Sequence, residues 1–433
     1  MATGPKPLWQ AAGAAGPDEA LRDFLAGDDI ACDRVLFPYD IQATRAHAGG
    51  LERIGLLSDE EASQIRDALD QLESEFEAGV FSLDARFEDG HTAIEHYLTE
   101  KAGPAGEKVH TGRSRNDQVL VASRLFLKDA MGRLVKLVRA LATACLDRAE
   151  ADADLPMPGY THLQRAVPSS VGMWLGGFAE ALADTLDFAS EVTAVIDCNP
   201  LGTAAGYGVN LPLDREGVSD ELGFARLQLN PVGAQMSRGK FEIMALQATS
   251  HALHDVGRLA WDLSLFTTAE FGFIELPDRY TTGSSIMPNK RNPDVVELLR
   301  ARPAVVDAAI HEIQAVVSLP SGYHRDLQFT KPPMIRALTA ALQALAVVPD
   351  LVREMEFNAE RMREAISQDM YATDAAQELA AEGVPFRSAY RRVKESGQEA
   401  PERSPEDSLR QRVSPGASGD LRLDDIRRRL VKG

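Results

Sequence analysis

The stretch "TTGSSIMPNKRNPDVVELL" at residues 281–299 places hydroxyl, lysine and asparagine side chains between two long apolar helical patterns. Asn292 followed by Pro293 is typical of the start of a helix, which the rest of the stretch would continue. A helix N-terminus beside Lys290 can bind an anion, and Ser284 would lie on the mobile part of the loop next to that anion. The alternative is a polar connection between helices without a chemical role.

A second polar stretch, "VHTGRSRNDQVL" at residues 109–120, stands directly before a long apolar pattern. Arg115 and Asn116 belong to a set of two arginines and two carboxamides, which suits recognition of a carboxylate at a helix start. The alternative is that Asn116 or Asp117 caps the helix while the arginines are solvated.

A third stretch, "MPGYTHLQRAVPSS" at residues 157–170, puts Thr161 and His162 between turn residues and a helical pattern. A histidine near its ordinary pKa of about 6.5 can give and regain a proton near neutral pH. The alternative is a histidine that only packs at an interface, and the same choice applies to His91 in "EDGHTAIEHYL". Both histidines gain a chemical role only if the separate stretches meet in space.

Long apolar patterns at helical spacing connect these stretches, at residues 55–80, 117–151, 168–197 and 237–270. In the first of them, Ser58 precedes two glutamates, which predicts an N-capped helix. The last would be on the order of 50 Å long if it were continuous. Alternating β-branched runs do not occur, so we predict an all-α fold around a long-helix bundle. Helices this long and apolar need neighbours from other subunits, which predicts an oligomer.

The composition limits the classes of partner. The 433 residues carry a formal net charge of −19, which opposes binding to nucleic acid and to anionic membranes. Three isolated cysteines without paired spacing predict neither a disulfide framework nor a zinc site. We find no signal-peptide pattern and no uninterrupted apolar stretch of membrane-spanning length, so we expect a protein of the reducing cytoplasm.

We divide the chain into an N-terminal helical domain (1–110), a central long-helix domain with the loop described first (111–365), and a small C-terminal helical domain with a tail (366–433). Residues 396–420 are rich in Ser, Pro, Gly and charge, which predicts a loop or disordered connection. The short basic segment "LDDIRRRL" at 423–430 predicts a closing helix.

Taken together, the three polar stretches resemble the fumarase and aspartase superfamily, whose signature is a GSSxMPxKxNP loop. "HTGRSRNDQV", "MPGYTHLQRA" and "ELPDRYTTGSSIMPNKRNPDVVEL" narrow the resemblance to the argininosuccinate lyase family, from roughly residue 20 to residue 395. The resemblance implies an elongated three-domain subunit and a homotetramer with a central core of 20 helices. Each active site would be built from three chains.

The resemblance also implies a reaction: reversible β-elimination of argininosuccinate to arginine and fumarate in arginine biosynthesis, by a carbon–nitrogen lyase without a metal or organic cofactor. It implies that Ser284 removes the carbon-bound proton, helped by Lys290 and backbone amides. His162, oriented by Glu297, would be the general acid. An older assignment in the superfamily makes the His–Glu pair the base, and the sequence leaves that direction open.

By the same resemblance, substrate carboxylates and the arginine half are held by residues from all three stretches and from two further segments, "AQMSRGKFE" and "SGYHRDLQFTK". Retention of the last segment favours argininosuccinate over smaller fumarate-like substrates. The implied substrate-binding residues are Arg115, Asn116, Thr161, Arg238, Lys290, Asn292, Tyr323, Gln328 and Lys331, with His91 as a further candidate.

The chain departs from the family pattern at several positions. The usual WGGRF is here "LWQAAGA", a substrate-contacting serine is replaced by Asp29, and Gly239 and Lys240 follow Arg238. Pro332 follows Lys331 in place of a glutamate. These departures leave three alternatives open: a divergent argininosuccinate lyase, a modified substrate such as an acylated argininosuccinate, or a weakened enzyme. Two wider alternatives are a lyase on another fumarate adduct such as adenylosuccinate and an inactive structural helical bundle.

Overall fold

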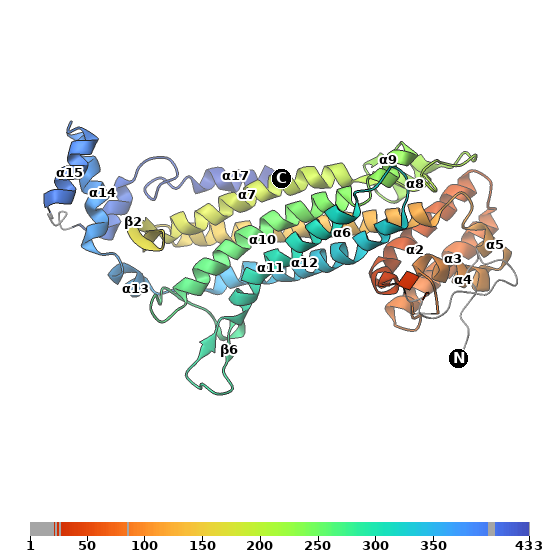
Figure 1. Ribbon diagram of the computed structural model, residues 1–433, viewed down its shortest axis with the longest axis horizontal. Helices are drawn as coiled ribbons and strands as arrows, with labels where there is room; N and C mark the ends of the chain where they lie inside the picture. The colour runs from red at the N-terminus through yellow and green to blue at the C-terminus, as the bar shows by residue number, and fades with distance from the viewer. Residues whose placement is uncertain (1–20, 22–23, 26, 85, 397–402, 433) are drawn as a thin grey trace. The chain divides into compact units, whose positions relative to one another are not determined.

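The structure is a computed structural model that describes residues 21, 24–25, 27–84, 86–396 and 403–432 (Figure 1). Helices dominate it, which confirms the predicted all-α class. The "LWQAAGA" segment lies outside the described residues. The helices are α2 (Asp29–Arg53), α3 (Asp59–Glu77), α4 (Gly90–Ala102), α5 (Pro104–Lys108), α6 (Arg115–Ala151), α7 (Val171–Ile196), α8 (Arg215–Glu221), α9 (Pro231–Met236), α10 (Lys240–Phe266), α11 (Asp294–Val316), α12 (Lys331–Glu354), α13 (Ala359–Glu364), α14 (Ala372–Ala381), α15 (Phe386–Ser396), α16 (Pro405–Gln411) and α17 (Leu423–Lys432).

The predicted long helices are present with shifted ends. α6 has 37 residues, which corresponds to roughly 55 Å. α10 has 27 residues, so it is roughly 40 Å long and shorter than the predicted 237–270 span. The shortening at its start has a local cause: Gly239 has a φ of 80°, and a Cβ there would lie 2.1 Å from the Val317 side chain. Only glycine fits this position, which accounts for one departure from the family pattern.

Two compact units make up the chain. The first contains Met1–Arg133, Glu191–Ala248 and Val306–Thr339, and the second contains Leu134–Ser190, Thr249–Val305 and Ala340–Gly433. The long helices contribute residues to both units. The three-domain division that we drew from the sequence stays a prediction.

In the first unit, α2, α3, α4 and α5 pack together (Figure 1) around a core that includes Phe37, Leu69 and Leu98, each at most 1% exposed. The predicted N-cap of α3 is present as a full capping box: the Glu61 amide donates to Ser58 Oγ, and the Ser58 amide donates to the Glu61 carboxylate. This core holds α2 and α4 together and thereby positions their polar side chains.

The start of α6 is fixed by the buried carboxylate of Asp117. It accepts hydrogen bonds from the amides of Ser114 (2.8 Å), Gly202 (3.0 Å) and Ala204 (2.9 Å). The Ser114 bond is an N-terminal cap, as the capping alternative predicted for Asp117. The other two bonds hold a distant loop beside the first turn of α6, where Asn116 lies. Asp117 is therefore a structural residue that positions this end of the site.

Short strands occur where the sequence predicted none. β1 (Pro156–Thr161) and β2 (Gln164–Ser170) form an antiparallel hairpin in the second unit, with an irregularity between Pro158 and Tyr160. The alternation rule misses them because their ladder runs through proline and glycine positions and has an exposed tip. The other strands are two residues long: β3 (Cys198–Asn199), β4 (Arg226–Leu227), β5 (Ile274–Glu275), β6 (Thr282–Gly283), β7 (Arg291–Asn292) and β8 (Glu356–Phe357), paired as β3–β4, β5–β8 and β6–β7.

The C-terminal segment is more ordered than predicted. Residues 397–402 lie outside the described residues, but α16 occupies part of the stretch expected to be a loop, with Ser404 as its N-cap. The predicted closing helix α17 is present. Arg427 pairs with Asp147 and Glu150 on α6, at 2.8 Å each, so charge pairing holds this helix against α6.

One segment, Arg325–Glu354, is long and apolar enough by length and composition to cross a membrane. It comprises the 3₁₀ helix η2 (Arg325–Thr330) and α12, and 56% of its most apolar window is buried within the chain. Core helices of globular proteins share these properties, so we assign it to the long-helix bundle.

We expect Asp117→Ala to lower the unfolding midpoint strongly. Two buried amides and one half-buried amide would lose a charged acceptor, and hydrogen bonds to charged groups contribute roughly 1.5–3 kcal/mol each. The matched control is Asp152→Ala, which removes only a half-exposed ion pair with Arg148 one turn away, worth about 0.5 kcal/mol. Thermal unfolding at one protein concentration compares them, and equal midpoints would show that the Asp117 bonds do not support the fold.

Candidate active site

A buried lysine organises the predicted substrate-binding residues of the first unit. The Lys331 ammonium is 2.6 Å from Asp29 Oδ1 and 2.9 Å from Asp33 Oδ1, and its side chain is only 6% exposed. The other oxygen of Asp33 accepts the Gly90 amide at 2.9 Å. Burial alone lowers the pKa of a lysine, but the carboxylates of Asp33 and Asp29 raise the pKa of Lys331 above its ordinary value. Lys331 is therefore a charged ammonium.

Arg115 lies in a second ion-pair network at the start of α4. Its guanidinium is 3.2 Å from Glu88 and from Asp89, and it donates to Thr92 Oγ1 at 2.9 Å. Burial opposes ionisation of Asp89, yet His91, Arg115 and the hydrogen bonds from Thr92 hold the pKa of Asp89 below its ordinary value. The arginine predicted to bind a substrate carboxylate thus already pairs with carboxylates of its own chain.

His91 belongs to the same end of α4. Its Nδ1 is 2.5 Å from Oδ2 of Asp40 on α2, and both side chains are at least nine-tenths buried. Burial by itself lowers the pKa of a histidine, but the charge of Asp40 and its hydrogen bond raise the pKa of His91 above 6.5. The imidazole therefore holds its proton more tightly than a free histidine does.

Arg238 and Tyr323 lie together, with the guanidinium carbon 5.5 Å from the ring centroid. Arg238 is 6% exposed, and its Nη1 has no hydrogen-bond partner among the described residues. A buried guanidinium nitrogen of this kind is suited to a carboxylate that arrives with a ligand. Gln328, on η2, donates through Nε2 to the Leu25 carbonyl at 3.1 Å, while Asn116 is half-buried on the first turn of α6.

The loop around Ser284 belongs to the second unit. Strands β6 and β7 pair Thr282 with Asn292, so Asn292 closes a hairpin and α11 begins two residues later, at Asp294 (Figure 1). The sequence had predicted Asn292 as the N-cap. Ser284 Oγ accepts hydrogen bonds from the amides of Ile286 (3.3 Å) and Met287 (3.0 Å). Two backbone donors are thus already directed at the serine oxygen.

The base of this hairpin is anchored by Arg291, which the sequence analysis did not assign. Its guanidinium is 2.7 Å from Asp278 and 3.1 Å from Glu275, and it donates to the Leu276 carbonyl at 2.9 Å. Lys290, one residue earlier, is exposed. The anchor therefore fixes the base of the loop while the lysine points to solvent.

Thr161 and His162 form the exposed tip of the β1–β2 hairpin. His162 has a φ of 54° and Leu163 one of 57°, a conformation that L residues adopt rarely and that occurs at functional turns. Glu297, the predicted partner of His162, is exposed on α11 and lies 3.5 Å from Arg300 of the same helix. No contact between Glu297 and His162 of one chain occurs among the described residues.

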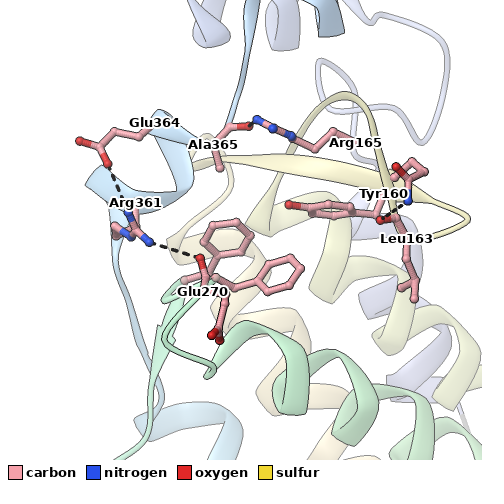
Figure 2. Close-up of a pocket in the computed structure, with 10 residues that line it drawn as sticks. Tyr160, Leu163, Arg165, Glu270, Arg361, Glu364 and Ala365 are labelled. Atoms are coloured by element: carbon pink, nitrogen blue, oxygen red, sulfur yellow. Dashed lines mark hydrogen bonds and ion pairs between the residues drawn. The ribbon is translucent and has the colours of Figure 1, made fainter.

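A pocket of about 490 Å³ lies beside this hairpin tip. Figure 2 shows Arg165 reaching from β2 to the Ala365 carbonyl, and Arg361 between Glu364 and the Glu270 carbonyl. None of the predicted site residues lines it. The wall residues are Tyr160, Leu163, Gln164, Arg165, Glu270, Phe271, Phe273, Arg361, Glu364 and Ala365.

The structure therefore divides the predicted residues into two groups. One, in the first unit, contains Arg115, His91, Lys331, Arg238, Tyr323, Gln328 and Asn116. The other, in the second unit, contains Ser284, Lys290, Asn292, Glu297, Thr161 and His162. Sequence reasoning missed Asp33, Asp40 and Asp89, which pair with the cations of the first group. The signal for Asp33 and Asp89 is the acidic character of "GDDIACD" and "EDGH", whereas Asp40 stands in "FPYDI" without such a signal. No metal-binding cluster of His, Cys, Asp or Glu occurs among the described residues.

Comparison with known proteins decides the family. Residues 25–306 match the family described as "Lyase". The chain is 55% identical over 423 residues to the argininosuccinate lyase of Stenotrophomonas maltophilia (strain R551-3), with 98% of each chain covered. The chain belongs to the argininosuccinate lyase family. Among solved structures, EDDS lyase in complex with formate superposes with a TM-score of 0.81 at 27% identity, covering 96% of this chain and 91% of the other.

A second solved structure, an EDDS lyase variant with bound fumarate, superposes with a TM-score of 0.79 at 26% identity and covers 96% of this chain and 91% of that one. The argininosuccinate lyase family thus shares its fold with a lyase of another name. Family membership fixes the fold and the lyase class, and the identity of the substrate rests on the site.

The His91–Asp40 pair predicts a pH dependence of stability. The pKa of His91 is raised in the folded chain, so its protonated form adds to the free energy of unfolding. This contribution is complete below the ordinary pKa of 6.5 and is lost as the pH rises through the raised pKa. We expect the thermal midpoints of wild type and His91→Asn to differ most at acidic pH and to converge as the pH rises. His311→Asn, at an exposed position on α11, is the control. A difference that grows with pH would contradict this account.

Proposed function

We propose that this chain is an argininosuccinate lyase, which cleaves argininosuccinate to arginine and fumarate by reversible β-elimination in arginine biosynthesis. The observation that carries the proposal is the 55% identity to argininosuccinate lyase over almost the full length of both chains. The retained Tyr323, Gln328 and Lys331 support it, because they lie beyond the loop shared by the superfamily. We expect a cytoplasmic enzyme that needs a small-molecule substrate and no cofactor.

The chemistry sets two demands on the site. Removing the proton next to a succinyl carboxylate creates a dianionic aci-carboxylate, which needs positive charge and backbone donors around it. The departing guanidinium nitrogen needs a proton from a general acid. Lys290 and Arg238 supply positive charge. Nη1 of Arg238, which has no hydrogen-bond partner among the described residues, is suited to one succinyl carboxylate.

We assign proton removal to Ser284. A serine hydroxyl is a poor base unless its alkoxide form is stabilised. The amides of Ile286 and Met287, which donate to its Oγ, support this role because the same bonds strengthen when the oxygen becomes negative. Closure of the hairpin over the substrate would bring Lys290 to the same oxygen and exclude water.

We assign proton donation to His162, with Glu297 of another chain as its partner. Both side chains are exposed in the single chain and face no contact with each other among the described residues, which fits a pair completed on assembly. We therefore propose a homotetramer in which three chains contribute to each active site. The reverse assignment, with the His–Glu pair as base, is separated from this one by the variants described next.

We expect Ser284→Ala to release fumarate from argininosuccinate at less than about a thousandth of the wild-type rate, and His162→Asn to be about 100- to 10,000-fold slower. Fumarate absorbance in the ultraviolet measures both. Ser285→Ala is the matched control, because this exposed neighbour has no assigned role. Activity retained by Ser284→Ala, with loss in His162→Asn, would favour the histidine as base. No fumarate from the wild-type protein would refute the proposed function.

The proposed tetramer predicts that disrupting the contacts between chains lowers the activity. Trp261 on α10 and Leu298 on α11 are 57% and 62% exposed, although both stand on long apolar helices. Replacing both with Asp should yield smaller species in sedimentation and lower activity by at least about 100-fold, because each site would lose its general acid. Val80→Asp, at an exposed position after α3, should change neither. An active monomer would contradict shared sites.

A lyase acting on another fumarate adduct is the second candidate. The observation in its favour is Asp29, which replaces a substrate-contacting serine of the family. A panel of argininosuccinate, its Nα-acyl derivative and adenylosuccinate, each scored by fumarate release, discriminates between the two. An inert helical bundle would release fumarate from none of them.

A further inference from the structure

Asp29 is the most exposed member of the cluster that it forms with Asp33 and Lys331. Its Oδ1 lies 2.6 Å from the Lys331 ammonium, and the side chain forms no ion pair or hydrogen bond with any other described residue. The side chain is 16% exposed, whereas those of Asp33 and Lys331 are 6% exposed. Asp29 is therefore the member of this cluster that a ligand can reach.

We propose that Asp29 binds the α-ammonium group of the amino-acid half of the substrate, so that the enzyme requires a free α-amine. This inference rests on the proposed function and deepens it, because it decides between argininosuccinate and its Nα-acylated form. Lys331 would hold the neighbouring α-carboxylate. The pair then recognises the two charges of a free amino acid together.

The neighbouring carboxylate is less accessible for this role. Asp33 already accepts from Lys331 with one oxygen and from the Gly90 amide with the other, and its side chain is only 6% exposed. Lys331, by contrast, is an ammonium with three N–H donors and two carboxylate contacts among the described residues. One donor is left for a substrate carboxylate beside Asp29.

The charges of the cluster select the amino-acid half. Asp29, Asp33 and Lys331 sum to one negative charge, and Asp89 and Glu88 outnumber Arg115 next to them. A dianionic succinyl group would be repelled here, whereas a zwitterion with an exposed ammonium is attracted. The guanidinium group fits less well, because it is bound best by two coplanar carboxylate oxygens and Asp29 offers one.

The reverse reaction tests the inference with three guanidino compounds. Purified protein is given fumarate with arginine, with Nα-acetylarginine, or with 5-guanidinopentanoate, and loss of fumarate absorbance is followed. The last compound removes the ammonium without adding bulk, so it separates charge recognition from steric exclusion. We expect wild type to prefer arginine over both by at least about 100-fold in kcat/KM, since sites built to bond a polar group reject analogues that lack it.

Asp29→Asn should reduce that preference to within about 10-fold, chiefly by slowing the reaction with arginine. Asp70→Asn, which alters an exposed partner of Arg45, is the control and should keep the wild-type preference. Calorimetric binding of arginine and 5-guanidinopentanoate gives the same comparison without turnover. Equal use or equal binding of the two compounds by wild type, or an unchanged preference in Asp29→Asn, would overturn the inference.

The outcomes separate the two proposals. Fumarate release from argininosuccinate, with no discrimination against 5-guanidinopentanoate, refutes the role of Asp29 and leaves the proposed function intact. If fumarate reacts with none of the three guanidino compounds and is not released from argininosuccinate, the proposed function is refuted. The binding comparison then still decides whether Asp29 selects an ammonium. A preference for Nα-acetylarginine over arginine would overturn the inference and identify the acylated adduct as substrate.

Discussion

Two ion pairs of one buried lysine join the helices that carry the predicted substrate-binding residues of the first unit. Lys331 is the first residue of α12, Asp29 and Asp33 stand on α2, and Asp33 also accepts the amide of Gly90, the first residue of α4. A buried charge is tolerated only while it stays paired, because loss of one partner costs about 3–5 kcal/mol. The ends of three helices are therefore held to one another by charge as well as by packing.

That constraint explains why the neighbouring polar side chains lie where they do. With α2 and α4 fixed, Asp40 and His91 meet at 2.5 Å, and Asp89 and Glu88 reach Arg115 at the start of α6. The result is a region with more carboxylates than cations. Such a region suits the cationic and zwitterionic half of argininosuccinate. Arg238 suits a carboxylate, because one of its guanidinium nitrogens has no hydrogen-bond partner within the described part of the chain.

The residues assigned to proton transfer lie on hairpins and, unlike the buried and ion-paired residues of the first unit, are largely exposed. Ser284 and Lys290 lie on one hairpin and His162 on the tip of another, and Lys290 and His162 are exposed in the single chain. Exposed catalytic side chains on short hairpins can be covered when a loop closes or when chains assemble. Arg291 fixes the base of the first hairpin through its contacts with Asp278 and the Leu276 carbonyl. The tip of that hairpin does not share these contacts.

How much the sequence predicted depends on how local each feature is. The capping box at Ser58, the long helices and α17 were correct, because helix starts and apolar faces are set by residues within a few positions. The β1–β2 and β6–β7 hairpins were missed. Their pairing joins short segments with proline and glycine, and α16 was hidden by a composition typical of loops.

The candidate site shows the same division. The sequence by itself determined the fold class, the family and the residue types available for acid–base chemistry, since these follow from composition, periodicity and short motifs. Only the tertiary structure decided that Lys331 pairs with Asp33, 298 positions away, that Asp40 lies against His91, and that Asp29 is the more exposed of the two carboxylates beside Lys331. Burial and charge act through space, so partners distant in the sequence become visible only once the chain is folded.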